Sequence, residues 1–194
     1  MKEKAEPKEY INVVTPKFRV SFPHLFEAKG AIVNGKETEP RFSLTMLFKK
    51  DTDLSKLKAA VKKACIEKWG DDETEWPDNL MLPWRDGDEE EKFDGYKGHI
   101  SAKADSKKQP GVVDKNKDDI FDKNEVYAGC FCRASVSVSA YALPGKRGAA
   151  GVKFYLQSVQ KLDEGPRFGR SAKDDFDDYE DDESSDDDTS DMGF

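Results

Sequence analysis

Three patterns in the sequence predict a mainly β protein, built as a small antiparallel β-barrel with one amphipathic α-helix. Apolar and polar residues alternate in several short segments separated by turn-forming residues, which is typical of such barrels. One segment, residues 51–70, has the helical period instead. The chain ends in a run of acidic residues and serines, which predicts a disordered acidic tail.

The first strong strand pattern covers residues 17–22. Because side chains alternate across a strand, one face receives three apolar side chains, Phe18, Val20 and Phe22. Lys17 and Arg19 point to the other face. The Asn34-Gly35 pair predicts a hairpin turn. Residues 41–50 alternate again, and their shared apolar face consists of Phe42, Leu44, Met46 and Phe48.

The helix predicted over residues 51–70 packs its apolar side on the sheet and exposes its lysines. Its buried positions are Leu54, Leu57, Val61, Ala64 and Cys65, and its candidate N-terminal caps are Asp51, Thr52 and Asp53. Gly70 can end it. Residues 71–98 form a long acidic loop, residues 99–104 a short strand, and residues 107–125 a polar loop with a Pro-Gly turn.

Two strong strand patterns, residues 125–142 and 151–162, close the barrel and are joined by a basic glycine-rich connection. A period of two in the first of them buries small side chains, Val126, Ala128, Cys130, Cys132, Ala134, Val136, Val138 and Ala140. The opposite face carries Tyr127, Phe131, Arg133, Ser135, Ser137, Ser139 and Tyr141. Rings spaced by short serines predict a platform on which nucleobases stack, with arginine beside them. The alternative is that the helix or the acidic loop covers these rings.

Nearby cations extend the predicted platform into a nucleic-acid surface. The candidate DNA-binding residues are Lys17, Arg19, Tyr127, Phe131, Arg133, Tyr141, Lys146, Arg147, Lys153 and Tyr155. Lys and Arg contact the phosphate backbone, while rings accept any base because every base has a π-face.

The charge divides unequally along the chain, whose formal net charge is -8. Residues 174–194 hold 12 of the 40 acidic residues and no Lys or Arg, so residues 1–173 have 32 basic and 28 acidic residues and a net charge of +4. Such asymmetry indicates an interaction tail or a nucleic-acid surface, the alternative being a tail that only aids solubility. We therefore divide the chain into a flexible N-terminus (1–9), the barrel domain (10–163), a basic linker (164–173) and the disordered acidic tail (174–194).

Other features exclude several classes of protein. No apolar run approaches the ~20 residues of a membrane span, and the charged N-terminus is unlike a signal peptide. These features predict a cytoplasmic protein. The three cysteines, Cys65, Cys130 and Cys132, do not predict disulfides. We expect the CFC pair on the buried side of a strand, since a zinc site needs about four ligands.

No cofactor, metal or enzymatic activity is predicted. The segment 114–125 has the ligand spacing of a calcium-binding loop, but Asp119 stands where that loop needs glycine. The acids in residues 86–91 could hold Mg²⁺ in a nuclease, yet no nucleophile or general base accompanies them. The motifs of nucleotide-binding loops and catalytic triads are missing from the sequence.

Six blocks carry a resemblance to a known family: RVSFPHLFEAK, LPWRDGD, YKGHISAKA, QPGVVD, VYAGCFCRASVSVSAYA and GVKFYLQSVQKL. In this order, over about residues 17–163, they resemble a phage family long described as a domain of unknown function. Its members are regarded as single-stranded DNA-binding proteins with an OB-type barrel. The resemblance implies an OB-like fold and a role in DNA replication, recombination or repair in the cytoplasm of an infected bacterium. In the usual OB order the helix follows the third strand, whereas here it follows the second strong one. Either the Asn34-Gly35 hairpin supplies the missing strand or the barrel is a variant.

The acidic tail, ending in Phe194, is then predicted to do two things. Tethered to a cationic groove, it competes with DNA. Once displaced, it docks on replication or recombination proteins through Phe176, Tyr179, Asp186, Asp187, Asp188, Asp191 and Phe194. The other function considered is an acidic DNA mimic that inhibits a host DNA-handling enzyme. The sequence does not distinguish a monomer from a dimer.

Overall fold

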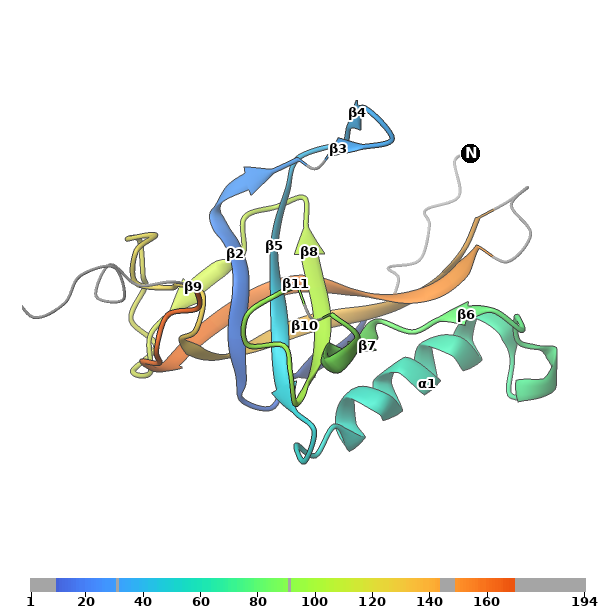
Figure 1. The fold of residues 1–194 in the computed structure, drawn as a ribbon. Helices are drawn as coiled ribbons and strands as arrows, with labels where there is room; N and C mark the ends of the chain where they lie inside the picture. The colour runs from blue at the N-terminus through green and yellow to red at the C-terminus, as the bar shows by residue number, and fades with distance from the viewer. Residues whose placement is uncertain (1–9, 31, 91, 144–148, 170–194) are drawn as a thin grey trace, which may run out of the picture.

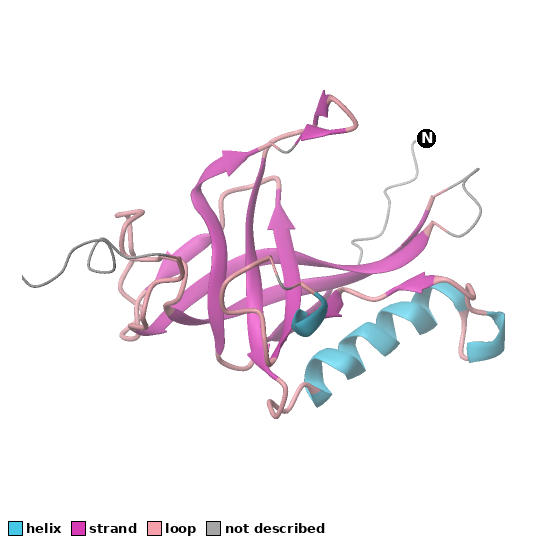
Figure 2. Cartoon of the chain, in the orientation of Figure 1, coloured by secondary structure: helices cyan, strands magenta, loops and turns pink. Residues whose placement is uncertain are grey.

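The computed structural model describes residues 10–30, 32–90, 92–143 and 149–169 (Figure 1). Its main elements are β1 (Ile11–Val14), β2 (Phe18–Lys29), β5 (Arg41–Lys49), α1 (Ser55–Trp69), β8 (His99–Ser106), β10 (Phe131–Ala142) and β11 (Ala150–Asp163). The short ones are β3 (Ile32–Val33), β4 (Lys36–Glu37), β6 (Leu80–Met81), β7 (Trp84–Asp86), β9 (Gly111–Val113) and the 3₁₀ turns Glu73–Glu75 and Gly87–Glu89. Strands dominate, with one long helix beside them (Figure 2). Among the described residues, no helix is long and apolar enough to cross a membrane.

Five strands close into a ring in the order β2-β5-β8-β11-β10 and back to β2. Numbered along the chain, the ring strands therefore follow one another as first, second, third, fifth and fourth. Most pairs are antiparallel, but β8 and β11 pair in parallel through Phe154 and Ala104. β1 pairs with β10, beside the ring. The predicted OB-like barrel is confirmed, with the correction that one pair in the ring is parallel.

Helix α1 follows the second strand of the ring and packs against β1, β10 and β11. Asp53 accepts a hydrogen bond from the Ser55 amide at 2.9 Å, and Gly70, at φ 93°, ends the helix. The Asn34-Gly35 hairpin forms as predicted, but β3 and β4 make a separate two-stranded sheet that projects from the barrel (Figure 1). The barrel is thus a variant in which the helix precedes the third strand.

The barrel interior combines large rings with small side chains. Phe18, Phe48 and Phe154 are almost fully buried, and Phe18 meets Phe48 edge to face at 5.7 Å between ring centroids. The small residues that leave room for them include Ala102, Ala104, Cys130, Cys132 and Ala134. Both thiols of the CFC pair are buried, as predicted, with their sulfur atoms 3.9 Å apart.

Several predicted boundaries and faces are wrong. The segment 71–98 is not loop alone, since it contains β6, β7 and two 3₁₀ turns, and β9 lies in the predicted loop 107–125. β10 begins only at Phe131, because Gly129 at φ 113° interrupts the extended chain. Ser137 was expected on an open polar face but is buried, and its hydroxyl donates a hydrogen bond to Asn12 of β1.

The predicted orientation of the Phe22 side chain is the most informative error. The alternation predicts that it points inward with Phe18 and Val20, but its side chain is 48% exposed. Its φ of 46° turns the ring outward, and the pairing of β2 with β5 is irregular between Ser21 and His24. A bulky residue with positive φ is uncommon and costs about 1–3 kcal/mol.

Replacing Phe154 by Ala should lower the free energy of unfolding by about 3–5 kcal/mol, because the fully buried ring leaves a cavity in the barrel. Urea denaturation followed by circular dichroism measures the change. Phe121→Ala is the matched control, since Phe121 is 84% exposed. Equal effects of the two substitutions would contradict the placement of Phe154 in the core.

Candidate nucleic-acid interface

A groove runs over the outer face of β5 and β8, and we call it the β5–β8 groove. It consists of two hollows of about 490 and 340 Å³ that share Phe22, Thr45 and Lys103. Side chains of β5 and β8 alternate between the core and this face, so small polar residues form its floor. These are Ser43, Thr45 and Ser101. The groove is therefore flat at its base and open to a planar ligand.

Aromatic rings form one wall of this groove. Phe22 packs edge to face on Phe93, with ring centroids 5.3 Å apart, and Phe93 lies 5.1 Å from Tyr96. The buried Tyr96 hydroxyl donates to Ser21 Oγ at 3.3 Å, which anchors this row of rings on β2. The outer ring, Phe22, is left with an exposed face. Such a ring can stack on a nucleobase of any identity.

The cations of the groove differ in how freely they can meet an anion. Within the described part of the chain, Lys103 and Lys29 form no ion pair. Lys153 instead pairs with Asp105 at 2.7 Å, a carboxylate that also pairs with Arg41 at 3.0 Å. Arg85 lies 3.7 Å from Glu90. Among the cations that line the groove, Lys103 and Lys29 are thus the two available to a phosphate.

His24, at one end of the groove, contributes no positive charge near neutral pH. Burial lowers its pKa from 6.5, and the positive charges of Lys29 and Lys103 lower it further. The imidazole is then neutral at pH 7 and can act as a donor or an acceptor.

The segment that carries Phe93 is held on the barrel by a cluster of hydrogen bonds and ion pairs. Lys50 Nζ meets Asp86 at 2.8 Å and Asp88 at 2.5 Å, and Asp88 accepts from the Gly98 amide at 2.6 Å. Lys50 lowers the pKa of Asp86. The Gly98 amide, and then Lys50, lower the pKa of Asp88. Two of the acids in residues 86–91, which were considered as Mg²⁺ ligands and not predicted to bind it, therefore have a structural role.

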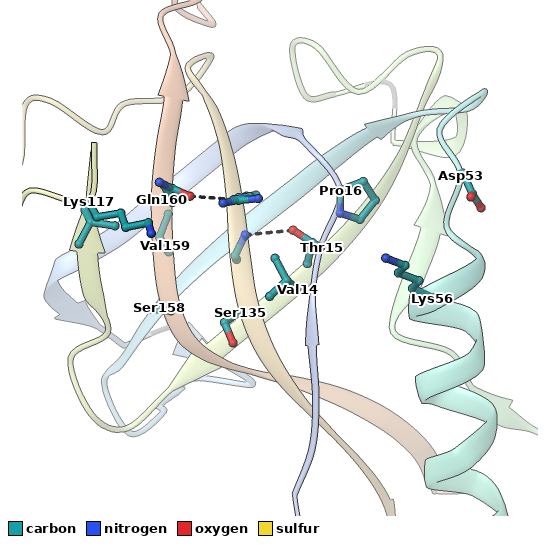
Figure 3. Close-up of a pocket in the computed structure, with 13 residues that line it drawn as sticks. Val14, Thr15, Pro16, Asp53, Lys56, Lys117, Ser135, Ser158, Val159 and Gln160 are labelled. Atoms are coloured by element: carbon teal, nitrogen blue, oxygen red, sulfur yellow. Dashed lines mark hydrogen bonds between the residues drawn. The ribbon is translucent and has the colours of Figure 1, made fainter. Parts of the chain in front are cut away.

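A second groove of about 680 Å³ lies between β10, β11 and the start of α1 (Figure 3). It contains the predicted residue Arg133, whose Nε donates to Gln160 at 2.7 Å, together with Lys56 and Lys117. None of the 13 lining residues is aromatic. This part of the predicted platform offers cations and serines but no ring for stacking.

Four other predicted residues, Lys17, Arg19, Tyr127 and Phe131, gather at the start of β10. Lys17 and Arg19 lie over the ring of Phe131, at 4.7 and 5.6 Å from its centroid. Tyr127 precedes the strand, and the Arg167 guanidinium lies 4.0 Å from its ring centroid. Burial, and then its bond to Glu164, raise the pKa of Tyr127. Tyr127 and Phe131 keep partial exposure, so they are not sealed in the core.

Residues 164–168, which we call the strap, cover this cluster. Arg19 donates to Pro166 O at 2.7 Å and to Gly129 O at 3.2 Å, and the Phe168 amide donates to Ala128 O at 3.1 Å. The fit is close, because a Cβ added to Gly129 would lie 2.1 Å from Pro166 O. Burial lowers the pKa of Arg19. The guanidinium of arginine nevertheless stays charged in proteins.

The remaining predicted residues lie elsewhere. Tyr141 and Tyr155 are half-buried on β10 and β11, and Lys153 Nζ is 5.4 Å from the Tyr155 ring centroid. Lys146 and Arg147 lie outside the described residues. So do the tail residues Phe176, Tyr179, Asp186, Asp187, Asp188, Asp191 and Phe194.

The candidate calcium loop is closed by its own hydrogen bonds. The Asp114 carboxylate accepts from the amides of Asn116 and Asp118 at 2.7 and 2.9 Å. Over the described parts of the chain, no three His, Cys, Asp or Glu side chains are grouped so that they could hold a metal ion.

Sequence reasoning missed the residues that make the β5–β8 groove, namely Phe22, Phe93 and Lys103. Phe93 follows a run of acids and looks like an ordinary loop residue. Lys103 alternates with Ala102 and Ala104 in a strand that was recognised, so the sequence could have placed its side chain on the outer face. The pairing of β5 with both β2 and β8, and the packing of Phe93 on Phe22, bring these residues together.

The closed five-stranded ring, with a groove on its outside that combines cations and rings, defines an OB-type barrel of the kind that binds oligonucleotides. A family model described as "Enterobacter phage Enc34, ssDNA-binding protein" matches residues 11–189. The chain belongs to this family of phage single-stranded DNA-binding proteins.

Individual relatives agree with this assignment. Protein p50 of Acyrthosiphon pisum secondary endosymbiont phage 1 is 32% identical over 173 residues, which are 82% of this chain and 89% of that protein. The single-stranded DNA-binding protein from bacteriophage Enc34 in complex with ssDNA has a similar structure, with a TM-score of 0.61 and 23% identity over 81% of this chain and 89% of that one. The structure of gp2.5, a single-stranded DNA-binding protein encoded by bacteriophage T7, matches with a TM-score of 0.60 and 16% identity over 90% of this chain and 97% of that one. At these identities the two structures show a shared fold.

Asp88→Ala should loosen the segment that carries Phe93, because it removes the acceptor of the Gly98 amide and one partner of Lys50. We expect hydrogen exchange of the Gly98 amide to become about tenfold faster or more. Acid should have the same effect on the unsubstituted protein: the Asp88 pKa is lowered, so the anchoring is complete above the ordinary value of 3.8 and is lost as the pH falls below it.

The control for this measurement is Asp94→Ala in the same segment, where the carboxylate is exposed. Equal exchange rates at Gly98 in both variants would mean that Asp88 does not anchor the segment.

Proposed function

We propose that this protein binds single-stranded DNA without sequence specificity in an infected bacterial cell. Bases stack on exposed rings, and lysine and arginine contact the phosphates. No catalytic step is involved. The β5–β8 groove is the main path for the strand.

One observation carries this proposal: exposed rings and unpaired lysines coincide on the barrel face by which OB folds bind oligonucleotides. That face consists of the second and third strands and is flanked by the loops between the first and second and between the fourth and fifth strands. Here it corresponds to β5 and β8, the connection that holds the β3–β4 hairpin, and the β10–β11 connection. Phe22 and Lys103 lie in the groove on this face.

The residues predicted from the sequence extend this path. Lys153 lines the groove, and Tyr155 and Tyr141 belong to the strands that lead from it to the basic connection with Lys146 and Arg147. Lys17, Arg19, Tyr127 and Phe131 offer a second group of rings and cations. Arg133 is suited to a phosphate, since its groove lacks rings.

The acidic tail acts as a tethered competitor for these cations. It follows a body of net charge +4, and tethering by a flexible linker gives an effective concentration of the order of mM. When DNA displaces the tail, its acids and Phe194 become available to a replication or recombination protein. The terminal ring supplies an apolar anchor, which ionic contacts alone do not, and Phe176 and Tyr179 supply a second one.

Phe22→Ala and Phe93→Ala should each weaken binding of an oligo-dT strand by about five- to hundredfold, because each removes a stacking surface. Fluorescence anisotropy with a labelled oligonucleotide at two salt concentrations measures the change. Affinity of the unsubstituted protein should fall as salt rises, because neutralised phosphates release counterions.

The matched control is Phe121→Ala, which removes an exposed ring that lies in neither groove and should leave affinity unchanged. If the unsubstituted protein does not bind oligo-dT at low salt, the proposed function is wrong. If it binds and both groove variants bind as tightly as the unsubstituted protein, the DNA strand follows another path.

Deleting residues 174–194 should tighten DNA binding by about tenfold at low salt, and less at high salt, because the competing charges are removed and their effect is screened. The same deletion should abolish stimulation of a phage or host polymerase or helicase. Titration with oligo-dT and a primer-extension assay test the two parts separately. Unchanged or weaker DNA affinity of the truncated protein would exclude competition by the tail.

A further inference from the structure

The ring of Phe168, in the strap, occupies a well-defined slot on the barrel surface. On its face lies the guanidinium of Arg19, 4.2 Å from the ring centroid. Another side is closed by Gly95, where an added Cβ would come within 2.2 Å of the ring. A planar group therefore fits between a flat cation and a residue that has no side chain.

The slot adjoins a cationic hollow of about 330 Å³. Arg19 belongs to both, and the hollow adds Lys17, Lys49, His99 and the ring of Phe131. Lys17 is ion-paired with Asp163, and among the described residues no acidic side chain lines the hollow. A flat site beside a site for negative charge matches the pairing of base and phosphate in a nucleotide.

The hold of the strap on this slot is shallow. Glu164, Pro166 and Arg167 are exposed, and Phe168 is only partly buried. The strap is held by hydrogen bonds from the Phe168 amide to Ala128 O, from Arg19 to Pro166 O, and between the Tyr127 hydroxyl and both Glu164 and Gly165. A ligand that replaces the Phe168 ring on Arg19 would regain the stacking that the strap loses.

We infer that this slot is a nucleobase-binding site for single-stranded DNA and that Phe168 occupies it as an internal substitute while DNA is absent. Guanidinium groups stack on bases as they do on phenyl rings. The inference rests on the proposed function and assigns a base to Arg19, in the second group of contacts outside the β5–β8 groove. Because the strap leads into residues 170–194, entry of a base and detachment of the acidic tail become a single event.

Phe168→Ala tests this inference, because it empties the slot and leaves Arg19 in place. We expect affinity for oligo-dT to rise roughly three- to tenfold, while Phe121→Ala, an exposed phenylalanine elsewhere, leaves it unchanged. Adding Arg19→Lys to Phe168→Ala should remove the gain, since lysine keeps the charge but not the flat stacking surface. Equal or weaker binding by Phe168→Ala, or a gain that survives Arg19→Lys, would overturn the slot.

Limited trypsin digestion of the full-length protein gives an independent readout. Oligo-dT should accelerate cleavage after Arg167, because the base displaces the strap, and protection of this bond would overturn the inference. If neither the unsubstituted protein nor Phe168→Ala binds oligo-dT, the proposed function itself fails. If both proteins bind equally well, the proposed function stands and only the nucleobase slot is wrong.

Discussion

The parallel pairing of β8 with β11 is the constraint on which the rest of the structure depends. Parallel strands cannot be joined by a tight turn, and here β9 and β10 lie between β8 and β11 along the chain. Without this pair, the ring would open into a single sheet in the order β11-β10-β2-β5-β8. Closure gives the barrel its interior and also turns the polar faces of β5 and β8 outward, where the groove lies.

The outer face of this barrel is shaped by the long connection between α1 and β8. Its Tyr96 is buried against β2, and it carries Phe93 to the exposed ring of Phe22. Phe22 needs a positive φ to meet it, a conformation that a bulky residue adopts at a cost. A phenylalanine pointing inward with Phe18 and Val20 would avoid that cost. Strain that places a ring in water is better explained by ligand binding than by stability, which is why Phe22 is central to the proposed function.

The sequence predicted what depends on local periodicity and missed what depends on single backbone angles or distant pairing. The faces of β5, the helix and its end at Gly70, and the buried CFC pair all follow from regular spacing of apolar residues. Phe22 was placed on the wrong face because its own positive φ ends the alternation, and Tyr127 was wrongly placed in a strand that begins only after Gly129. Of the predicted site, Lys17, Arg19 and Phe131 do lie together, since β2 and β10 pair directly at these residues. The β5–β8 groove could not be found, because its residues come from four separate segments.

The docking of the strap is another feature that the local sequence does not predict. Its sequence, with Gly, Pro and Arg, is typical of a linker, and nothing local indicates that it docks. Docking depends on glycines in three segments, Gly95, Gly129 and Gly165, each at a point where an added Cβ would collide with the neighbouring chain.

The charges of the barrel explain why this contact matters for DNA binding. In the β5–β8 groove, Lys153 is already paired with Asp105, and Lys103 and Lys29 are the lysines left to hold a phosphate. A body whose net charge is only +4 draws part of its affinity from rings. An internal ring such as Phe168 is then a more effective competitor than added acidic residues alone.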